Sequence, residues 1–372
     1  MRADVKIEYN PAEVMNPVFQ NDSRTPFTPA SQPWIKFAKD NNIRLVIKNT
    51  GHDFAGKSTG AGSLSLWTHN MNEAQQRSFR LDVGLAGGYT PGGGHSLLNS
   101  VHGMAADAVL EWEAVTAEGK HLIATPRQDS DLYWALSGGG DVFAFYPTVA
   151  DTPGGMDFEV ANNSLIANSI VIPNKTPEEI EELFSPLLSQ LEKRGIHPLH
   201  LRARVLRFLL LTTRLISRDS VYDPKQLADI VAALQAPIET RYYGIGCRAL
   251  NVKNTTHPDN TVLPEWRNAV ALCNLVGYWD WTISTADNLV RKEDLVGQIL
   301  PAIDAATPGA GSYLNEIEAE YRGDWKNELY GVNYDPLLSI KDKYDPAHLF
   351  YAHFAVGMDY WTVGSGGRLC RA

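Results

Sequence analysis

The chain has 372 residues, of which 44% are hydrophobic and 20% are charged. This balance is typical of globular proteins and excludes a disordered or fibrous chain, and the length predicts two domains because single cores stop growing at about 250–300 residues. The 33 Lys and Arg residues against 43 Asp and Glu residues give a net charge of −10. Without any basic block, neither nucleic acid nor a membrane is expected as a partner, and no apolar run approaches the length of a membrane span.

The first part of the chain predicts a helix, a strand, a turn-rich loop and a second strand. Residues 1–33 are rich in Pro, Asn and Ser and predict an irregular lead-in. The helix is expected to start near Trp34 and to end at Asp40. Strands are expected at 43–47 and 63–67, separated by the turn-rich residues 49–62.

A second loop is predicted over residues 84–95, which contain six glycines. Neither a helix nor a strand tolerates that density of glycine. Residues 105–115 then predict a strand, and residues 131–136 predict a short helix that ends at Gly138 to Gly140.

The middle and the end of the chain mix helices and strands. Residues 176–194 predict an amphipathic helix with a kink or break near Ser185, and a second helix is expected at 224–234. Strands are expected at 239–250 and 275–284, and residues 336–344 predict a helix. The strand aromatics indicate an apolar or ring-containing substrate, or simply core packing: Tyr242, Trp279 and Trp281.

The cysteines and the glycosylation sequons bear on the compartment. Cys247, Cys273 and Cys370 allow one disulfide with one thiol left over, and they form no zinc pattern. Four Asn-x-Ser/Thr sequons indicate a secretory route: Asn21, Asn162, Asn174 and Asn254. Residues 1–20 contain no basic-then-apolar signal segment, so localisation stays open.

Two glycine-containing loops are the best candidates for a binding site. Residues 48–58 follow a strand, and their backbone N–H groups, with Lys57 and Ser58, suit a phosphate; the alternative is an ordinary solvated turn. Residues 84–96 let a large planar ligand press against backbone, whereas the alternative is a flexible linker. The histidines show no metal-ligand spacing and no Ser-His-Asp pattern is present, so neither a metal site nor a hydrolase triad is expected.

These stretches resemble a known family. Residues 45–53 and 60–70 resemble the first flavin loop of fungal FAD-linked oxidases with a PCMH-type FAD domain, and residues 83–107 resemble their second flavin loop. Residues 132–136 are similar to the segment that follows. The tail resembles the berberine-bridge C-terminal element of the vanillyl-alcohol-oxidase superfamily, from Tyr330-Gly331-Val332-Asn333-Tyr334 through Tyr344-Asp345-Pro346 and Leu349-Phe350 to Gly367-Arg368-Leu369-Cys370.

The resemblance implies an α+β flavoprotein with two lobes. The FAD domain would take residues 1–150 and the returning element 322–372, and an antiparallel-sheet substrate domain would take residues 151–321. The implied reaction removes hydride from an alcohol, amine or activated carbon with O₂ as electron acceptor. Tyr313 and Tyr330 are the candidates for the catalytic base, although each suits packing or flavin contact as well.

FAD is the implied cofactor, with His52 at the position that holds the 8α-histidyl flavin bond in this family. The residues that the resemblance and the loops point to for cofactor binding are Asn49, Thr50, Gly51, His52, Asp53, Gly56, Lys57, Ser58, Val83, Gly84, Gly87, Gly88, Gly93, Gly94, His95 and Asn333. Arg80 stands where bicovalent members have a second, cysteinyl link, so that link is not expected. Val83 stands at the position that gates oxygen, where a small aliphatic residue suits an oxidase.

The chain also departs from the family, because it is shortened inside the flavin lobe. Strand and helix segments of the relatives are missing at 32–35 and between 70 and 79, and residues 140–145 replace a glycine-rich run. Three hypotheses follow: an active oxidase with a pruned lobe, a degenerate member that acts as a non-redox cyclase or binding protein with little flavin, or a faulty gene model that omits segments.

Overall fold

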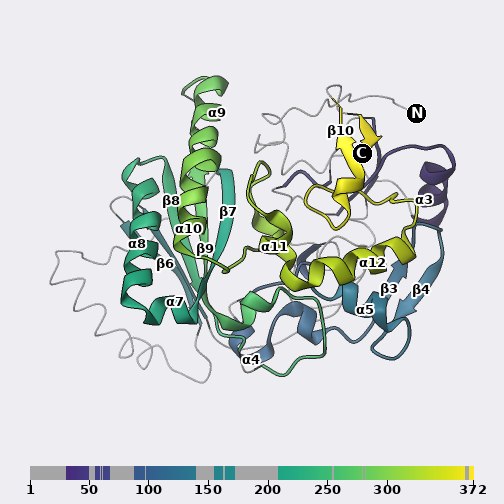
Figure 1. Ribbon diagram of the computed structural model, residues 1–372, viewed down its shortest axis with the longest axis horizontal. Coiled ribbons are helices and arrows are strands. Elements are labelled where there is room, and N and C mark those ends of the chain that lie inside the picture. Colours follow the sequence, from purple (N-terminus) through teal and green to yellow (C-terminus); the bar gives the residue numbers. More distant parts are fainter. Residues whose placement is uncertain are drawn as a thin grey trace.

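The computed structural model describes residues 31–49, 55–58, 60, 62–67, 88–96, 98–139, 155–161, 164–171, 208–253, 255–278, 280, 282–364 and 368–372. Two regions lie side by side in Figure 1. One is a sheet with helices on one face, and the other is a lobe where early and late parts of the chain meet. Helices and antiparallel sheets together confirm the predicted α+β class.

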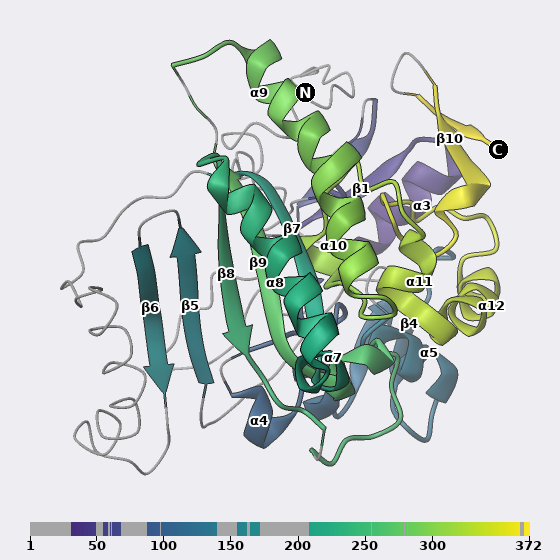
Figure 2. The same cartoon turned by 60° about the vertical axis from the view of Figure 1, so that its left-hand side comes forward.

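The central sheet is antiparallel, with the strand order β6-β5-β8-β9-β7 that Figure 2 shows. Its strands are β5 Gly155–Ala161, β6 Ser164–Val171, β7 Phe208–Ser217, β8 Tyr243–Ala249 and β9 Ala269–Tyr278. Strand β9 lies between two neighbours, and Leu272, Cys273 and Leu275 are all buried. A disulfide joins Cys247 of β8 to Cys273 of β9, and Cys370 is free and exposed, so the single expected pair is formed.

Two predicted boundaries in this sheet were wrong. The strand expected at 275–284 is β9, Ala269–Tyr278, because a central strand covered on both faces is a continuous apolar run rather than an alternating one. The strand expected to begin at 239 begins at Tyr243, since the preceding helix α8 extends over Pro224–Glu239. Asp223 starts that helix by accepting the N–H groups of the next turn.

The two faces of the sheet have different neighbours. Helices cover one face (Figure 2), where Ile230, Ile245 and Leu300 are buried together. On the other face, Leu272 packs with Trp266 and Tyr313. The covering helical elements are α7 Arg218–Tyr222, α8, α9 Thr285–Asp294, η5 Leu295–Ile299 and α10 Leu300–Ala306. The second face therefore looks toward the predicted binding loops.

The other region joins both parts of the chain. Leu45 forms a β-bridge with Phe350, and one core contains Trp112, Leu132 and Tyr330. Its helices are α3 Ser31–Asp40, α5 Ser130–Leu136, α11 Trp325–Tyr330 and α12 Tyr334–Tyr344. Its strands pair as β1 Leu45–Lys48 with β2 Leu64–Trp67, β3 Trp112–Val115 with β4 His121–Ala124, and β10 Trp361–Val363 with β11 Leu369–Arg371.

Short helical turns complete the described chain, and one of them corrects a prediction. They are α4 Asn99–His102, η3 Ala105–Ala108, η4 Pro264–Asn268, η6 Leu314–Glu316, η7 Gly331–Asn333 and η8 Met358–Tyr360. The strand expected at 105–115 is only β3, preceded by η3. Asp107 holds η3, because its carboxylate accepts the N–H of Met104 at 2.8 Å and pairs with Arg267 at 2.6 Å.

The amphipathic helix expected at 176–194 lies outside the described residues. Among the described helices, none is both long and apolar enough to cross a membrane.

A buried ion pair stabilises the end of α12. Lys341 and Asp345 are 1% and 0% exposed, and Lys341 Nζ lies 3.0 Å from Asp345 Oδ2. The carboxylate also accepts the N–H groups of Leu349 at 2.7 Å and Phe350 at 2.9 Å, while Lys341 donates to the Phe350 carbonyl at 2.8 Å. This pair therefore ties α12 to the segment that pairs with β1.

Replacing Asp345 by Asn leaves the Lys341 ammonium buried without its counter-charge. We expect the free energy of unfolding to fall by about 3–5 kcal/mol, measured by urea denaturation. Asp342→Asn, on the exposed side of the same helix, is the matched control and should cost less than about 1 kcal/mol. Equal losses in the two variants would contradict the stabilising role of the pair.

Candidate functional site

One segment, Ser312–Glu316, contacts both predicted binding loops. The Asn315 side-chain amide donates to the Gly88 carbonyl at 2.8 Å, and Lys57 Nζ donates to the Leu314 carbonyl at 3.4 Å. Lys57 belongs to the first loop and Gly88 to the second. The described parts of the two loops therefore meet at this segment.

The second loop is shaped by close packing and is not a flexible linker. A Cβ on Gly92 would lie 2.9 Å from both Asn315 Cγ and the Gly88 oxygen. Gly94 has φ +68°, and a Cβ there would lie 2.6 Å from the Ala105 side chain. At these two positions glycine is therefore needed for packing within the protein, as well as for any ligand.

Tyr313 lies at the centre of this site. Its side chain is 3% exposed, and its ring centroid lies 4.6 Å from that of His95 and 5.6 Å from that of Trp266. The hydroxyl accepts a hydrogen bond from Asn315 Nδ2 at 2.8 Å. Burial, and then the charge of Glu316, raise the pKa of Tyr313 well above its usual value, against the opposing effects of Asn315 and Arg248.

Three residues at this site were not among the predicted ones: Arg248, Asn315 and Glu316. Arg248 Nη1 donates to His95 Nδ1 at 2.6 Å, and Glu316 Oε1 lies 3.6 Å from His95 Nε2. A signal was present for Arg248, because it is the one charged residue of β8. No local pattern distinguishes Asn315 or Glu316, since their role depends on a loop more than 200 positions away.

The second candidate base, Tyr330, lies in the core of the lobe that joins the early and late parts of the chain. It is 1% exposed, its hydroxyl donates to the Phe354 carbonyl at 2.8 Å, and its ring packs against Tyr334. Asn333, a predicted cofactor residue, donates to the Thr261 carbonyl at 3.2 Å. Packing accounts for Tyr330, which leaves Tyr313 as the candidate beside the loops.

The remaining predicted residues divide by location. Those outside the described residues are Thr50, Gly51, His52, Asp53, Val83, Gly84 and Gly87. Those that lie in the described parts of the loops are Asn49, Gly56, Lys57, Ser58, Gly88, Gly93, Gly94 and His95. His95, with its ring against Tyr313, is the one most deeply placed in the site.

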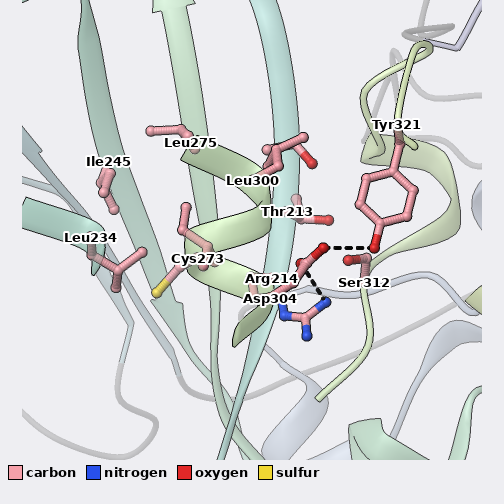
Figure 3. A pocket seen from close by; sticks show the side chains of 12 residues that line it. Thr213, Arg214, Leu234, Ile245, Cys273, Leu275, Leu300, Asp304, Ser312 and Tyr321 are labelled. Carbon is pink, nitrogen blue, oxygen red and sulfur yellow. Dashed lines mark hydrogen bonds and ion pairs between the residues drawn. The ribbon is translucent and has the colours of Figure 1, made fainter. Parts of the chain in front are cut away.

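Two hollows lie near this site. Figure 3 shows a pocket between the sheet and its helices, where Asp304 accepts a hydrogen bond from Tyr321 and pairs with Arg214. Its volume is about 10 Å³. That volume holds at most one water molecule, so it is not a substrate site. A hollow of about 550 Å³ is lined by Trp325, His353 and others. Burial lowers the pKa of His353, a hydrogen bond with the Ala319 carbonyl opposes this, and the Lys57 charge adds to the lowering.

Two loops converging on a buried tyrosine, beside the face of the sheet that the helices leave uncovered, suit a large flat cofactor and a proton acceptor. This is the arrangement of a flavin-dependent oxidoreductase. The family model described as berberine and berberine-like matches residues 312–357, which include Tyr313 and the tail motif from Tyr330 to Phe350.

The comparisons with known proteins agree. The bifunctional decalin synthase calF of Penicillium decumbens is 42% identical over 97% of this chain and 84% of its own length. A VAO-type flavoprotein oxidase of Thermothelomyces thermophilus is 35% identical, with 97% and 84% covered. The crystal structure of a VAO-type flavoprotein from Myceliophthora thermophila C1 has a TM-score of 0.82 at 33% identity, covering 92% of this chain and 80% of that one.

The chain belongs to the berberine-bridge-like FAD-linked oxidoreductases of the vanillyl-alcohol-oxidase superfamily. The similarity to the decalin synthase extends over 483 residues, which exceeds the 372 residues of this chain by 111. The relative therefore has internal segments with no counterpart here, as the short joins predicted.

The described residues fit an FAD cofactor. Lys57 and the glycine backbone of the second loop supply a cation and close backbone approach. Two buried polar atoms beside the second loop, His95 Nε2 and Glu316 Oε2, have no hydrogen-bond partner among the described residues. Bound FAD would thus be held between the two loops, with Tyr313 alongside.

Replacing Gly92 by Ala should displace Asn315 and break its hydrogen bond to Gly88. We expect the affinity for FAD to fall about tenfold, as the loss of one hydrogen bond worth about 1–1.5 kcal/mol implies. The measurement is the flavin-to-protein absorbance ratio of the purified enzyme. Gly297→Ala in η5 is the control, since its nearest atom is 3.4 Å from the new Cβ; a similar loss there would refute the explanation.

Proposed function

We propose that this protein is an FAD-dependent oxidase that removes hydride from a small alcohol, amine or activated carbon and passes the electrons to O₂. The observation that carries the proposal is Tyr313, a buried phenol beside both loops whose oxygen accepts a hydrogen bond from Asn315. When bound, FAD supplies the acceptor for the hydride. The relatives named as flavoprotein oxidases support this chemistry.

Tyr313 would take the proton that the substrate loses with the hydride. Overall the substrate loses two hydrogens, and O₂ gains them as H₂O₂. Asn315 and Arg248 favour the phenolate, whereas burial and Glu316 oppose it. Because the pKa of Tyr313 is raised, the phenolate becomes more populated as the pH rises, and turnover should rise with pH in the alkaline range.

We also propose that FAD is bound covalently through His52. The support is the resemblance of the residues 45–53 to the first flavin loop, because His52 itself lies outside the described residues. Arg80 excludes a cysteinyl link at the second position.

A second candidate function is ring formation without net oxidation. The specific observation that favours it is the 42% identity to a protein named as a bifunctional decalin synthase. A buried tyrosine that could give and take a proton also suits such a reaction. The two functions differ in the mass of the product, because a cyclised product is isomeric with its substrate.

Tyr313→Phe should lower kcat by about 10²–10⁴-fold, the usual effect of losing a general base, and leave the flavin bound. The assay mixes the holoenzyme anaerobically with an aryl alcohol, an aliphatic amine or cellobiose, follows bleaching of the flavin, and then measures H₂O₂ in air. Tyr330→Phe is the control and should lose only about 0.5–1.5 kcal/mol of stability. A product isomeric with its substrate, without H₂O₂, would favour the cyclase instead.

Acid precipitation tests the covalent bond. The yellow colour should stay with the precipitated protein and pass to the supernatant for His52→Ala, because the imidazole is the proposed point of attachment. His121→Ala, an exposed histidine of β4, should retain the colour. Colour released entirely from the parent protein would refute the bond.

A further inference from the structure

A line of three polar side chains contacts Tyr313 through its middle member, His95, which the proposed reaction leaves unused. Arg248 comes from β8, His95 from the second loop and Glu316 from η6. The His95 side chain is 7% exposed and contacts both of the others, with Nδ1 2.6 Å from Arg248 Nη1 and Nε2 3.6 Å from Glu316 Oε1. The line therefore runs from the substrate sheet to the segment that holds the tyrosine.

The contact with Arg248 decides which tautomer His95 adopts. A guanidinium only donates hydrogen bonds, so His95 Nδ1 must accept and cannot hold a proton. The imidazole proton then sits on Nε2, on the side of Glu316. At 3.6 Å, Nε2 is too far from Glu316 Oε1 for a hydrogen bond, and it has no hydrogen-bond partner among the described residues.

Tyr313 packs edge-on against His95, the middle member of this line, with ring centroids 4.6 Å apart, and the charges at the two ends act on it with opposite signs. Glu316 opposes ionisation of its phenol and Arg248 favours it. The other groups against Tyr313 are neutral in the described part of the chain: Tyr89 and His95 of the loop, Asn315, Trp266 of η4 and Thr213 of β7, whose hydroxyl oxygen accepts the Tyr313 N–H. Tyr89 feels the same two charges, with the same signs.

We propose that Arg248, His95 and Glu316 are positioning residues that set the charge around Tyr313, with His95, whose ring packs against Tyr313, serving as a fixed neutral bridge and not as an acid or base. This inference rests on the proposed function, since it concerns how readily Tyr313 accepts the substrate proton. It adds His95 of the second loop to the residues that act on that step, together with the contacts that join His95 to Arg248 and Glu316.

Neutralising the two ends should move the ionisation of Tyr313 in opposite directions. Glu316→Gln removes the negative charge and should shift the midpoint about one pH unit lower, and Arg248→Gln should shift it about one unit higher. The readout is the near-ultraviolet tyrosinate absorbance of the holoenzyme, taken as the difference from Tyr313→Phe because the chain has 15 tyrosines. The pH profile of kcat/KM should move with it.

Two substitutions of His95 separate a bridge from an acid or base. His95→Gln has an acceptor oxygen for Arg248 and a donor N–H for Glu316, so the midpoint should stay within a few tenths of a unit of the parent value. His95→Leu has neither group, so Arg248 and Glu316 should no longer be held in place beside Tyr313. The midpoint of the Tyr313 ionisation should then move. A profile displaced equally by both variants would mean that the imidazole itself titrates, which would overturn the bridge.

Control variants distinguish a failure of this inference from a failure of the proposed oxidase function. Arg248→Lys retains the charge and should keep the midpoint, and Glu111→Gln neutralises an exposed carboxylate elsewhere and should change nothing. If Glu316→Gln and Arg248→Gln shift the midpoint in the same direction, or not at all, the inference fails. The absorbance titration needs no turnover, so a correct titration with no oxidised product would instead count against the oxidase.

Discussion

The amide of Asn315 is the contact on which the site depends. Its nitrogen lies 2.8 Å from the Gly88 carbonyl and 2.8 Å from the Tyr313 hydroxyl, so one side chain holds a glycine loop and a candidate base at a fixed separation. An amide nitrogen has two N–H groups and can satisfy both acceptors at once. Gly92 has to lack a side chain because the amide occupies that space. The same side chain therefore fixes both the shape of the second loop and the position of the Tyr313 hydroxyl.

The central sheet supports this contact from behind. One face is sealed by α8 and α10, and the cavity left there is about 10 Å³, so that side of the sheet is occupied by packing. The other face presents Arg248 and, through η4, Trp266 to the loops. Residues that face opposite sides alternate along β8, where Cys247 belongs to the helix-covered core and Arg248 reaches His95.

The shortening of the flavin lobe leaves these contacts in place. The relatives have internal segments that this chain lacks, yet the family model matches at residues 312–357 and the described loops still meet at the segment 312–316. The parts that touch the candidate base are supplied by the second loop, the sheet and the tail.

The residues alone were enough to predict the family, the α+β class, the two loops and Tyr313 as a candidate base, and they allowed for one disulfide without naming its partners. Glycine density, helix caps and motifs in chain order involve neighbouring residues, so they can be recognised in the sequence without a structure. Local patterns misplaced β9, because a strand buried on both faces loses its alternation. Only the tertiary structure separated Tyr313 from Tyr330 and brought Arg248 and Glu316 to His95, since those contacts join residues 153 and about 220 positions apart and depend on which elements pack together.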